Sequence, residues 1–261
     1  MIYNFVNQSI NIYTMRFNNK NVIITGASEG IGFSTAKAFI QEGATVWITG
    51  RNKAKLENAA LEISNSRLKT IVSDTAILED IDYLSREVEQ ANFEIDVLFM
   101  NAGTGLFSTI ENTSEVDFDL QFKTNVKGSF FTLQKLMPYL KNGATVIFTS
   151  STAATASIIE SSVYAATKAS INKIAKIASN ELADRNIRVN IISPGPIATS
   201  GFEKDVAEEA KKALASGIAL KRMGLPDEVA KTVLFLSSEE AGFINGTEIL
   251  VDGGFINYSL K

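Results

Sequence analysis

From residue 21 onward, the chain alternates short runs of β-branched and other apolar residues with longer segments of helical pattern, and this alternation limits its possible folds more than any other feature. Such alternation is typical of βαβ units, which build a parallel sheet with helices on both faces. Each apolar run is nearly continuous, as expected for a strand buried on both faces. We therefore predict an α/β fold, a doubly wound sheet of seven parallel strands at Asn21–Thr25, Ala44–Thr49, Leu68–Ser73, Ile95–Met100, Ala144–Ser150, Ile187–Ser193 and Glu248–Val251.

Six segments between these strands carry the helical pattern. They are Ile31–Gln41, Lys53–Ile63, Leu78–Ala91, Val116–Leu140, Ser162–Ala183 and Asp227–Leu236. A length of 261 residues fits one such domain, which we assign to residues 17–261. We assign residues 1–16 to an N-terminal extension, for which three interpretations stay open: a disordered segment, a short ordered arm or the product of a mis-assigned start. The Glu/Lys/Ala-rich insertion Gly201–Gly217 follows a strand end, so we expect a substrate lid at about residues 200–220.

The composition excludes several classes of chemistry. The sequence contains no Cys and no His, so disulfides, thiolate nucleophiles, zinc fingers and imidazole bases are ruled out, and we expect no metal site. A net charge of -4 without a long block of one sign argues against a nucleic-acid partner. No apolar run approaches the roughly 18 residues that a membrane span needs, and no signal-peptide pattern opens the chain, so we predict a cytoplasmic protein with no membrane partner.

The first predicted strand runs into the sequence Thr25-Gly26-Ala27-Ser28-Glu29-Gly30-Ile31-Gly32 and then into a helix. Gly26 can form the tight turn, Gly30 lets the backbone approach a pyrophosphate, and Gly32 lets the helix pack closely on the sheet. The N–H groups and the dipole at the helix N-terminus favour an anion. The GxxxGxG spacing therefore predicts a phosphate cradle, although three glycines at such a turn also suit tight packing alone.

Arg51 follows the second predicted strand, where the adenosine ribose lies in a Rossmann unit. An acidic residue here would bind the ribose 2'-hydroxyl, whereas a guanidinium favours a 2'-phosphate. Glu29 in the glycine loop opposes this, because a carboxylate near that phosphate would repel it. We predict that NADP(H) is favoured and that NAD(H) is possible, with a solvated surface role for Arg51 as the alternative.

Tyr164 and Lys168 lie four residues apart near the start of a long helical segment, and hence on one face of it. A phenol ionises near pH 10, and a cation about 4 Å away in an effective dielectric of about 20 is worth roughly 4 kcal/mol. We therefore predict that Lys168 lowers the pKa of Tyr164 and makes it a general acid/base. As a lone pair, this spacing also fits an exposed helix surface.

These motifs occur together with others in an order that resembles the short-chain dehydrogenase/reductase family, over about residues 18–254. The further matching positions are Asp74, Asn101-Ala102-Gly103, Asn125, Ser150-Ser151, Pro194-Gly195-Pro196-Ile197-Ala198-Thr199 and Asp252-Gly253-Gly254. The chain is most similar to the single-domain members that carry a catalytic tetrad, such as 3-oxoacyl reductases. The resemblance implies a Rossmann-fold enzyme that transfers a hydride between a nicotinamide cofactor and a carbonyl or secondary alcohol.

The resemblance also implies roles for individual residues. Ser151 would hydrogen-bond the substrate oxygen, and Tyr164 would protonate it during reduction or take its proton during oxidation. Lys168 would bind the nicotinamide ribose and lower the pKa of Tyr164, and Asn125 would hold a water for proton relay. The implied cofactor contacts are Gly26, Ser28, Glu29, Gly30, Ile31, Gly32, Arg51, Asp74, Thr75, Asn101, Ala102, Gly103, Tyr164, Lys168, Pro194, Gly195, Ile197 and Thr199.

Several of these assignments have a structural alternative. Asp74, Asn101 and Thr199 follow strand ends, where short polar residues often cap helices or close turns. The resemblance places Asp74 at the adenine, Asn101 on the adenosine side and Thr199 at the nicotinamide amide. We expect Asp252 to be structural.

The substrate is predicted only in outline. The apolar stretch Thr152–Val163, together with Phe202, Val206, Leu214 and Ile218, suits a carbonyl or alcohol of moderate size. The two longest helical segments carry apolar residues on more than one face, and similar proteins form dimers or tetramers, so we expect a homo-oligomer, with a homotetramer as the largest form. Two other functions stay open: an NAD(P)-binding regulatory or scaffold protein without turnover, and a lyase or epimerase on the same scaffold.

Overall fold

The structure of the protein is a computed structural model that describes residues 15–199 and 207–257. A seven-stranded parallel sheet with the order β3-β2-β1-β4-β5-β6-β7 forms its centre. The strands are β1 (Asn21–Ile24), β2 (Thr45–Gly50), β3 (Leu68–Val72), β4 (Ile95–Met100), β5 (Leu140–Thr149), β6 (Arg188–Pro194) and β7 (Glu248–Val251). The predicted α/β fold class and all seven predicted strands are confirmed.

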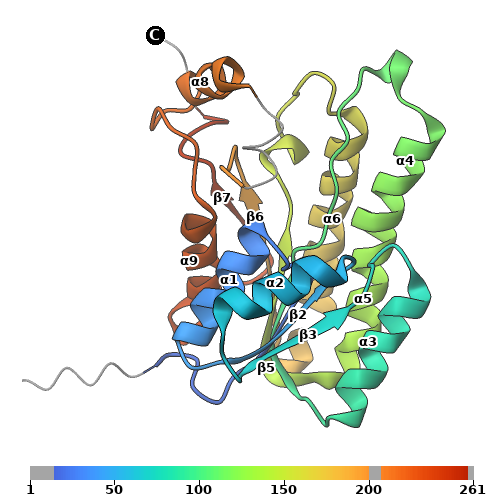
Figure 1. Cartoon of the computed structure of the whole chain (residues 1–261), viewed down its shortest axis with the longest axis vertical. Helices are drawn as coiled ribbons and strands as arrows, with labels where there is room; N and C mark the ends of the chain where they lie inside the picture. Colours follow the sequence, from blue (N-terminus) through green and yellow to red (C-terminus); the bar gives the residue numbers. More distant parts are fainter. Residues whose placement is uncertain (1–14, 200–206, 258–261) are drawn as a thin grey trace, which may run out of the picture.

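Helices cover both faces of the sheet (Figure 1). They are α1 (Gly30–Gln41), α2 (Lys53–Ile63), α3 (Leu78–Gln90), α4 (Glu115–Gln121), α5 (Ser129–Leu136), α6 (Ser162–Glu181), α8 (Glu208–Ser216) and α9 (Pro226–Ser237). One hydrophobic core joins the sheet to α1, α2 and α9, and a second joins its other face to α3, α5 and α6. The order of strands reverses between β1 and β4, which is where a doubly wound sheet opens a crevice at its carboxyl edge.

The alternation of side chains along the strands explains why both faces must be covered. In β1, Val22 and Ile24 enter the first core, whereas Ile23 enters the second, and all three are fully buried. Trp47 of β2 likewise faces the second core and stacks on Phe93, with ring centroids 4.3 Å apart. Successive residues of a strand point to opposite faces, so a strand with no polar position needs an apolar partner layer on each side.

The helix predicted over Val116–Leu140 is not continuous. It consists of α4, a π-helical segment η2 (Phe122–Gly128), α5 and the short 3-10 turn η3 (Met137–Tyr139), which contains Pro138. Strand β5 then begins at Leu140, four residues before the predicted Ala144. A shift in the pairing with β4 explains the difference, because Ile95 pairs with Leu140 but Val97 pairs with Thr145, so that residues 141–144 bulge from the ladder.

The two segments of uncertain function are only partly described. Residues 1–14 of the predicted extension lie outside the described residues, but Arg16 at its end already belongs to the fold, because its guanidinium contacts the Glu42 carboxylate at 2.9 Å. Of the expected lid, residues 200–206, including Phe202 and Val206, lie outside the described residues. Within the remainder, Glu208–Ser216 form α8, which the sequence analysis did not predict as a helix.

Candidate active site

The glycine loop after β1 has the conformation that a phosphate cradle needs. Gly26 and Gly30 adopt positive φ angles of 64° and 62°, which L-residues with a side chain rarely adopt. A Cβ on Gly26 would lie 2.7 Å from the Cα of Ala102, and a Cβ on Gly32 would lie 2.5 Å from the carbonyl oxygen of Gly26. Helix α1 begins at Gly30, which lines the groove with Ile31, so the N-terminus of the helix lies at the groove. Its first turn has no acidic residue, and the carboxylate of its N-cap residue, Glu29, is paired with Lys55.

Asn101, at the end of β4, holds this loop in place. Its side-chain amide donates a hydrogen bond of 2.8 Å to the carbonyl oxygen of Gly26, and its main-chain N–H donates one of 3.0 Å to the hydroxyl of Thr25. The N–H of Ala102 donates to the same hydroxyl at 3.0 Å. Its side-chain oxygen also accepts a hydrogen bond of 3.3 Å from the Thr149 hydroxyl, so Asn101 links the end of β4 to the glycine loop and to β5 while it lines the groove.

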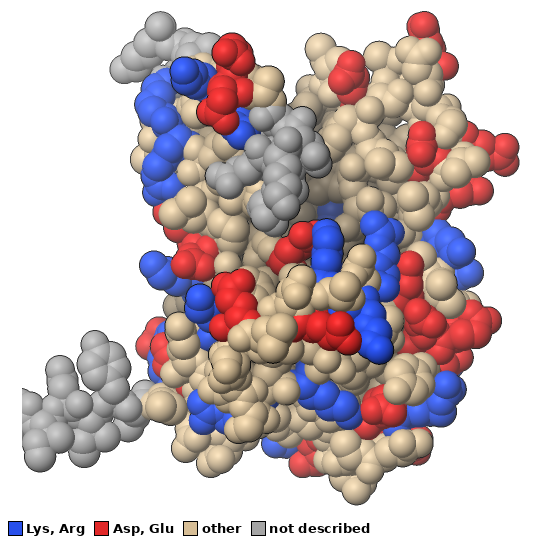
Figure 2. All heavy atoms as spheres, in the orientation of Figure 1, with Lys and Arg blue, Asp and Glu red and all other residues tan. Residues whose placement is uncertain are grey.

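Two adjoining cavities form a groove along the carboxyl edge of the sheet, in the hollow above α1 and α2 in Figure 2. The first, of about 240 Å³, is lined by the ends of β1 to β4, and the second, of about 270 Å³, reaches Tyr164 and Lys168. The two cavities share the lining residues Glu29, Asn101, Gly103 and Thr104.

The structure brings most of the predicted site residues to this groove. Those that line it are Gly26, Ser28, Glu29, Gly30, Ile31, Arg51, Asp74, Thr75, Asn101, Ala102, Gly103, Tyr164, Lys168 and Thr199. The lining also includes residues that the sequence analysis missed, among them Thr104, Gly105, Thr124 and Thr149.

Four predicted cofactor contacts, Gly32, Pro194, Gly195 and Ile197, lie outside the lining of both cavities. Pro194 ends β6, and Gly195 packs so closely on Asp252 that a Cβ there would lie 2.7 Å from the Asp252 Cβ. Ile197 is buried and pairs with Gly224. The carboxylate of Asp252 accepts hydrogen bonds from the N–H groups of Gly254 and Ile256 at 2.9 and 3.0 Å, and closes a turn.

Charged residues crowd the end of the groove next to β2. Glu29 and Arg51 both line the first cavity, and the Glu29 carboxylate forms an ion pair of 2.8 Å with Lys55 on α2. The side chain of Asn52 accepts a hydrogen bond from the main chain of Lys55 and so caps α2. Within the part of the chain that the structure describes, the Arg51 guanidinium forms no hydrogen bond or ion pair.

Thr124 adds a polar group to the same cavity that the sequence analysis did not identify. Its hydroxyl is buried and has no hydrogen-bond partner in the structure, although it belongs to a residue that lines the cavity. A buried hydroxyl without a partner is costly, which is why such groups are usually found where a ligand or water completes them. No sequence signal distinguishes it, because a threonine beside Asn125 has many structural uses.

Asn125 lies inside the π-helical segment η2 and is fully buried. Its side-chain oxygen accepts a hydrogen bond from the N–H of Thr104 at 2.8 Å. Its amide donates to the Thr104 carbonyl at 2.8 Å and to the Thr167 hydroxyl at 2.9 Å. Both amide hydrogens are therefore used, and the side chain retains only acceptor capacity for a water. The wider π turn, a feature often found at functional sites, places this asparagine between the β4 loop and α6.

Lys168 is buried on α6 and points at the end of β5. Its ammonium donates a hydrogen bond of 2.9 Å to the carbonyl oxygen of Thr149 and lies 5.6 Å from the centre of the Tyr164 ring. Burial lowers the pKa of Lys168 to about 8, because the charged form loses hydration. A Cβ on Gly103 would lie 3.2 Å from this ammonium and 3.3 Å from the Asn125 side-chain oxygen, so the glycine keeps both groups at one site.

Tyr164 differs from the prediction in the direction of its pKa. Burial raises the pKa of the phenol, and a hydrogen bond with Ser151 opposes that rise only in part. The predicted lowering by Lys168 is therefore wrong for this structure, because the ammonium is engaged by Thr149 and desolvation disfavours the phenolate. The contact between Ser151 and Tyr164 nevertheless brings together the two side chains predicted to act on the substrate oxygen.

Phe107 covers one side of Tyr164 and was not identified from the sequence. The two rings meet edge to face with centroids 5.5 Å apart, and the Phe107 side chain is 61% exposed. Leu106 is also exposed beside it. The apolar wall predicted at Thr152–Val163 lines a different hollow, of about 870 Å³, which shares no lining residue with the groove. The loop after β4 therefore supplies further apolar surface next to Tyr164.

The described ranges 15–199 and 207–257 contain neither a membrane-spanning helix nor a metal-binding cluster of acidic side chains. None of their helices has both the length and the apolar character that crossing a membrane requires. In the same residues, no three acidic side chains gather in a way that could hold a metal ion.

The comparisons with known proteins agree with this geometry. Residues 26–256 match a family model described as enoyl-(acyl carrier protein) reductase. An oxidoreductase asL5 from Sarocladium schorii is 37% identical over 92% of this chain and 96% of its own length. The 3-oxoacyl-[acyl-carrier-protein] reductase FabG of Thermotoga maritima is 36% identical over 93% of this chain and 100% of its own. Among solved structures, the RhlG/NADP active-site complex of Pseudomonas aeruginosa matches with a TM-score of 0.88 and 25% identity, over 93% of this chain and 98% of the other.

Proposed function

Because the chain belongs to the short-chain dehydrogenase/reductase family, whose members are NAD(P)-dependent oxidoreductases, we propose that it is an NADP(H)-dependent enzyme acting on a carbonyl or secondary alcohol, with Tyr164 as general acid/base. The single observation that carries the proposal is the meeting of Tyr164, Ser151 and Lys168 at one end of the groove. A protein that only bound the nucleotide would need the glycine loop but not this polar cluster.

The groove suits a dinucleotide. Gly26 and Gly30 line the groove in a backbone conformation that residues with a side chain rarely adopt, and the N-terminus of α1 lies at the same space. The buried hydroxyl of Thr124 has no partner in the first cavity, which supports a polar ligand there. When bound, the nicotinamide ring supplies or accepts the hydride.

Arg51 supports the phosphorylated form of the cofactor. It stands one residue before the cap of α2, where an anion also benefits from the helix N-terminus. The first turn of α2 contains no acidic residue, and Arg51 lines the first cavity without an ion-pair partner among the described residues. The similar Pseudomonas structure is a complex with NADP, which agrees with this assignment.

In reduction, the Tyr164 hydroxyl gives its proton to the substrate oxygen, and Ser151 donates a hydrogen bond to the same oxygen as negative charge develops on it. Because burial raises the pKa of Tyr164, the free phenol holds its proton and can act as the acid. Lys168 and Asn125 lie close together beside Gly103 and provide the route by which the phenolate recovers a proton. In oxidation the same groups act in reverse.

The surroundings of Tyr164 favour an apolar group next to the reacting carbon. Phe107 and Leu106 present exposed apolar surface there, and among the described residues Lys168 is the only lysine or arginine that lines the second cavity. We therefore propose a carbonyl or alcohol substrate of moderate size with an apolar flank.

The outer faces of α4 and α6 support assembly into a homo-oligomer. Val116 and Phe118 of α4 and Ile177 of α6 are 75%, 44% and 47% exposed. Large apolar side chains at this exposure are typical of a surface that a partner covers. Light scattering after gel filtration measures the oligomeric state directly.

The experiment that tests the proposed function compares NADPH with NADH. Each is titrated against the purified protein by nicotinamide fluorescence, and absorbance loss is then followed with ketones, 3-oxoacyl thioesters and sugars. We expect tighter binding of NADPH and turnover of at least one apolar carbonyl. The Tyr164→Phe variant should bind NADPH as the parent does and lose turnover by about 10²–10⁴-fold. Binding without turnover in every assay would contradict the proposal.

A further inference from the structure

We propose that Lys55 determines the preference for a cofactor that carries a 2'-phosphate, and that it does so as a positioning residue by neutralising Glu29. The inference rests on the proposed NADP(H) dependence and names a residue that decides it. Arg51 can pair with the 2'-phosphate because the carboxylate of Glu29 is paired with the ammonium of Lys55.

The structure places three charges at one corner of the groove. Glu29 and Arg51 line the same cavity of about 240 Å³. The segments that carry them lie against each other, since a Cβ on Gly50 would be 3.5 Å from the Cβ of Ser28. The Lys55 ammonium lies 2.8 Å from the Glu29 carboxylate, but Lys55 does not line the cavity. Lys55 therefore approaches Glu29 from outside the space that the ligand would fill.

Local structure determines where Lys55 points. The Asn52 side chain accepts a hydrogen bond of 3.0 Å from the Lys55 N–H and fixes the first turn of α2, while the buried Leu56 next to it fixes the rotation of the helix. Lys53, two positions earlier, turns away and pairs with Glu57 on its own helix at 3.8 Å. The same turn thus contains one lysine directed at the glycine loop and one that is not.

The charge balance explains the effect on specificity. With Lys55 present, the Glu29 carboxylate is already paired with a cation, so it does not compete with a phosphate for the Arg51 guanidinium. Without Lys55, the unpaired carboxylate would repel the 2'-phosphate and would attract the Arg51 guanidinium. A ligand without that phosphate would be affected much less, because it places no dianion at this corner. Both partners of the pair are 51% exposed, so the effect should weaken as salt screens it.

The test uses ligands that lack nicotinamide, so that it does not depend on turnover. Isothermal titration calorimetry measures the Kd values of 2',5'-ADP and of 5'-ADP for the parent, Lys55→Met, Glu29→Gln and the double variant. We expect Lys55→Met to weaken 2',5'-ADP by about tenfold and 5'-ADP by less than about threefold. In the Glu29→Gln background, the same lysine substitution should change the 2',5'-ADP affinity by less than about threefold.

Lys53→Met is the matched control, because it removes one lysine from the same helical turn without touching Glu29. It should leave the ratio of the two Kd values unchanged. An equal loss from Lys55→Met in both backgrounds would overturn the inference, because Lys55 would then act on the phosphate directly. An equal loss for both ligands would also overturn it, since that is the result of structural damage. If the parent protein did not prefer 2',5'-ADP at all, the proposed NADP(H) dependence would fail instead.

Discussion

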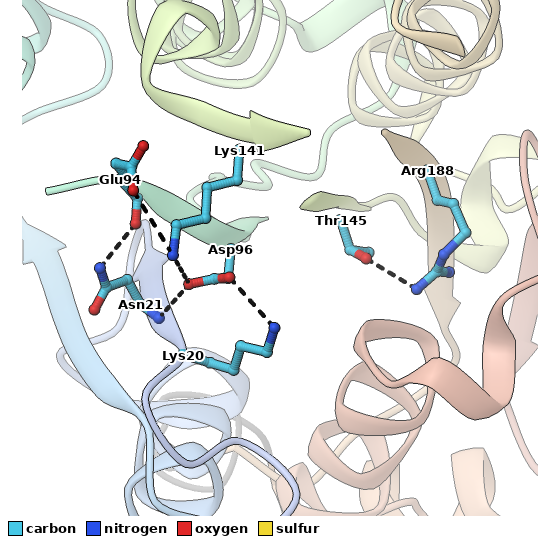
Figure 3. A network of polar contacts seen from close by, with 7 residues as sticks. All are labelled: Lys20, Asn21, Glu94, Asp96, Lys141, Thr145 and Arg188. Carbon is cyan, nitrogen blue, oxygen red and sulfur yellow. Dashed lines mark hydrogen bonds and ion pairs between the residues drawn. The ribbon is translucent and has the colours of Figure 1, made fainter. Parts of the chain in front are cut away.

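At the amino ends of the strands, Lys20 and Lys141 contact the carboxylate of Asp96 at 3.5 and 3.2 Å (Figure 3). At the carboxyl ends, in contrast, Lys168 is buried without a carboxylate partner among the described residues. Asp96 also accepts a hydrogen bond of 2.9 Å from the N–H of Asn21. Lys20 and Lys141 at the amino edge thus share a carboxylate, whereas the ammonium of Lys168 at the carboxyl edge has a carbonyl oxygen as its partner.

Arg188 extends the comparison. It is half-buried at the start of β6, and it donates hydrogen bonds to the Thr145 hydroxyl at 2.9 Å and to the carbonyl of Ser238, which ends α9, at 3.2 Å. Burial lowers its pKa, but its donors serve the end of a helix, where a cation is favoured. The amino edge therefore uses its cations to hold strands and helices together. The carboxyl edge keeps polar groups in reach of a ligand. We therefore expect substitutions at the amino edge to lower mainly stability, and substitutions at the carboxyl edge to lower mainly activity.

Among the substitutions that compare the two edges, the largest effect is expected for Ser151→Ala at the carboxyl edge. It removes the hydrogen bond to the substrate oxygen, so kcat/KM should fall by about 10²–10³-fold. The free energy of unfolding should fall by about 1 kcal/mol or less, because the only fold contact of this hydroxyl in the described residues, apart from Tyr164, is the one it accepts from the Ala153 N–H at 3.2 Å. Steady-state kinetics and urea unfolding measure the two effects. Ser157→Ala, on the same loop, is the control and should change neither.

Lys168→Met tests how much the buried cation lowers the free energy of unfolding, and how this effect depends on pH. In the folded protein the pKa of Lys168 is about 8, and in the unfolded chain it is near 10.5. Between these values the unfolded chain binds more protons, so the free energy of unfolding of the parent should rise with pH relative to the variant, by about 3 kcal/mol in total. Urea unfolding at pH 7, 8, 9 and 10 measures this. The parent should be least stable relative to the variant at pH 7, and a difference independent of pH would contradict the prediction.

Asp96→Ala tests the amino edge. It removes a carboxylate that is only 11% exposed and that accepts hydrogen bonds from the Asn21 N–H and the Lys141 ammonium. The free energy of unfolding should therefore fall by about 1–3 kcal/mol. Because Asp96 stands at the other end of β4 from Asn101, kcat/KM should stay within about twofold. Asp96→Asn retains an acceptor for the N–H and should lose less. A large loss of activity in a fully folded Asp96→Ala protein would show that the two edges are coupled.

The smallest effect is expected for Lys20→Ala. The Lys20 side chain is 48% exposed and lies 3.5 Å from Asp96, which Lys141 and the Asn21 N–H still hold after the substitution. Exposed pairs of this kind contribute about 0.2–1 kcal/mol, and we expect the lower part of that range. Thermal unfolding at low and at high salt measures it. A loss as large as that of Asp96→Ala would mean that Lys20 is the main partner of this carboxylate.

The sheet could be predicted from the sequence because its strands are buried on both faces and contain almost no polar interruption. The same reasoning failed between Val116 and Leu140, where the pattern of apolar residues does not distinguish a continuous helix from one with a π turn. The early start of β5 was missed because the polar residues Lys141 and Asn142 belong to a bulge beside β4. Helix α8 was missed because its apolar residues are few and none is buried in the core.

In the groove, the motif residues were predictable and their neighbours were not. Gly26, Tyr164 and Lys168 are recognisable because each has a spacing that chemistry requires. Lys55 and Phe107 carry no such spacing, since an ion pair of 2.8 Å with Glu29 and an edge-to-face contact with Tyr164 depend on how loops meet. The direction of the Tyr164 pKa was misjudged for the same reason, because desolvation is a property of the packed site and not of a four-residue spacing.

By itself, the sequence determined the fold class, the seven strands of the sheet, and the exclusion of thiol, imidazole and zinc-finger chemistry. These depend on local periodicity and on residue type, which are complete in the chain before it folds. Only the tertiary structure decided which cation holds Glu29, which aromatic ring covers Tyr164, and how far burial moves the pKa of Lys168. Those properties depend on distances and solvent exclusion between segments that are remote in sequence, and electrostatic energies change steeply with both.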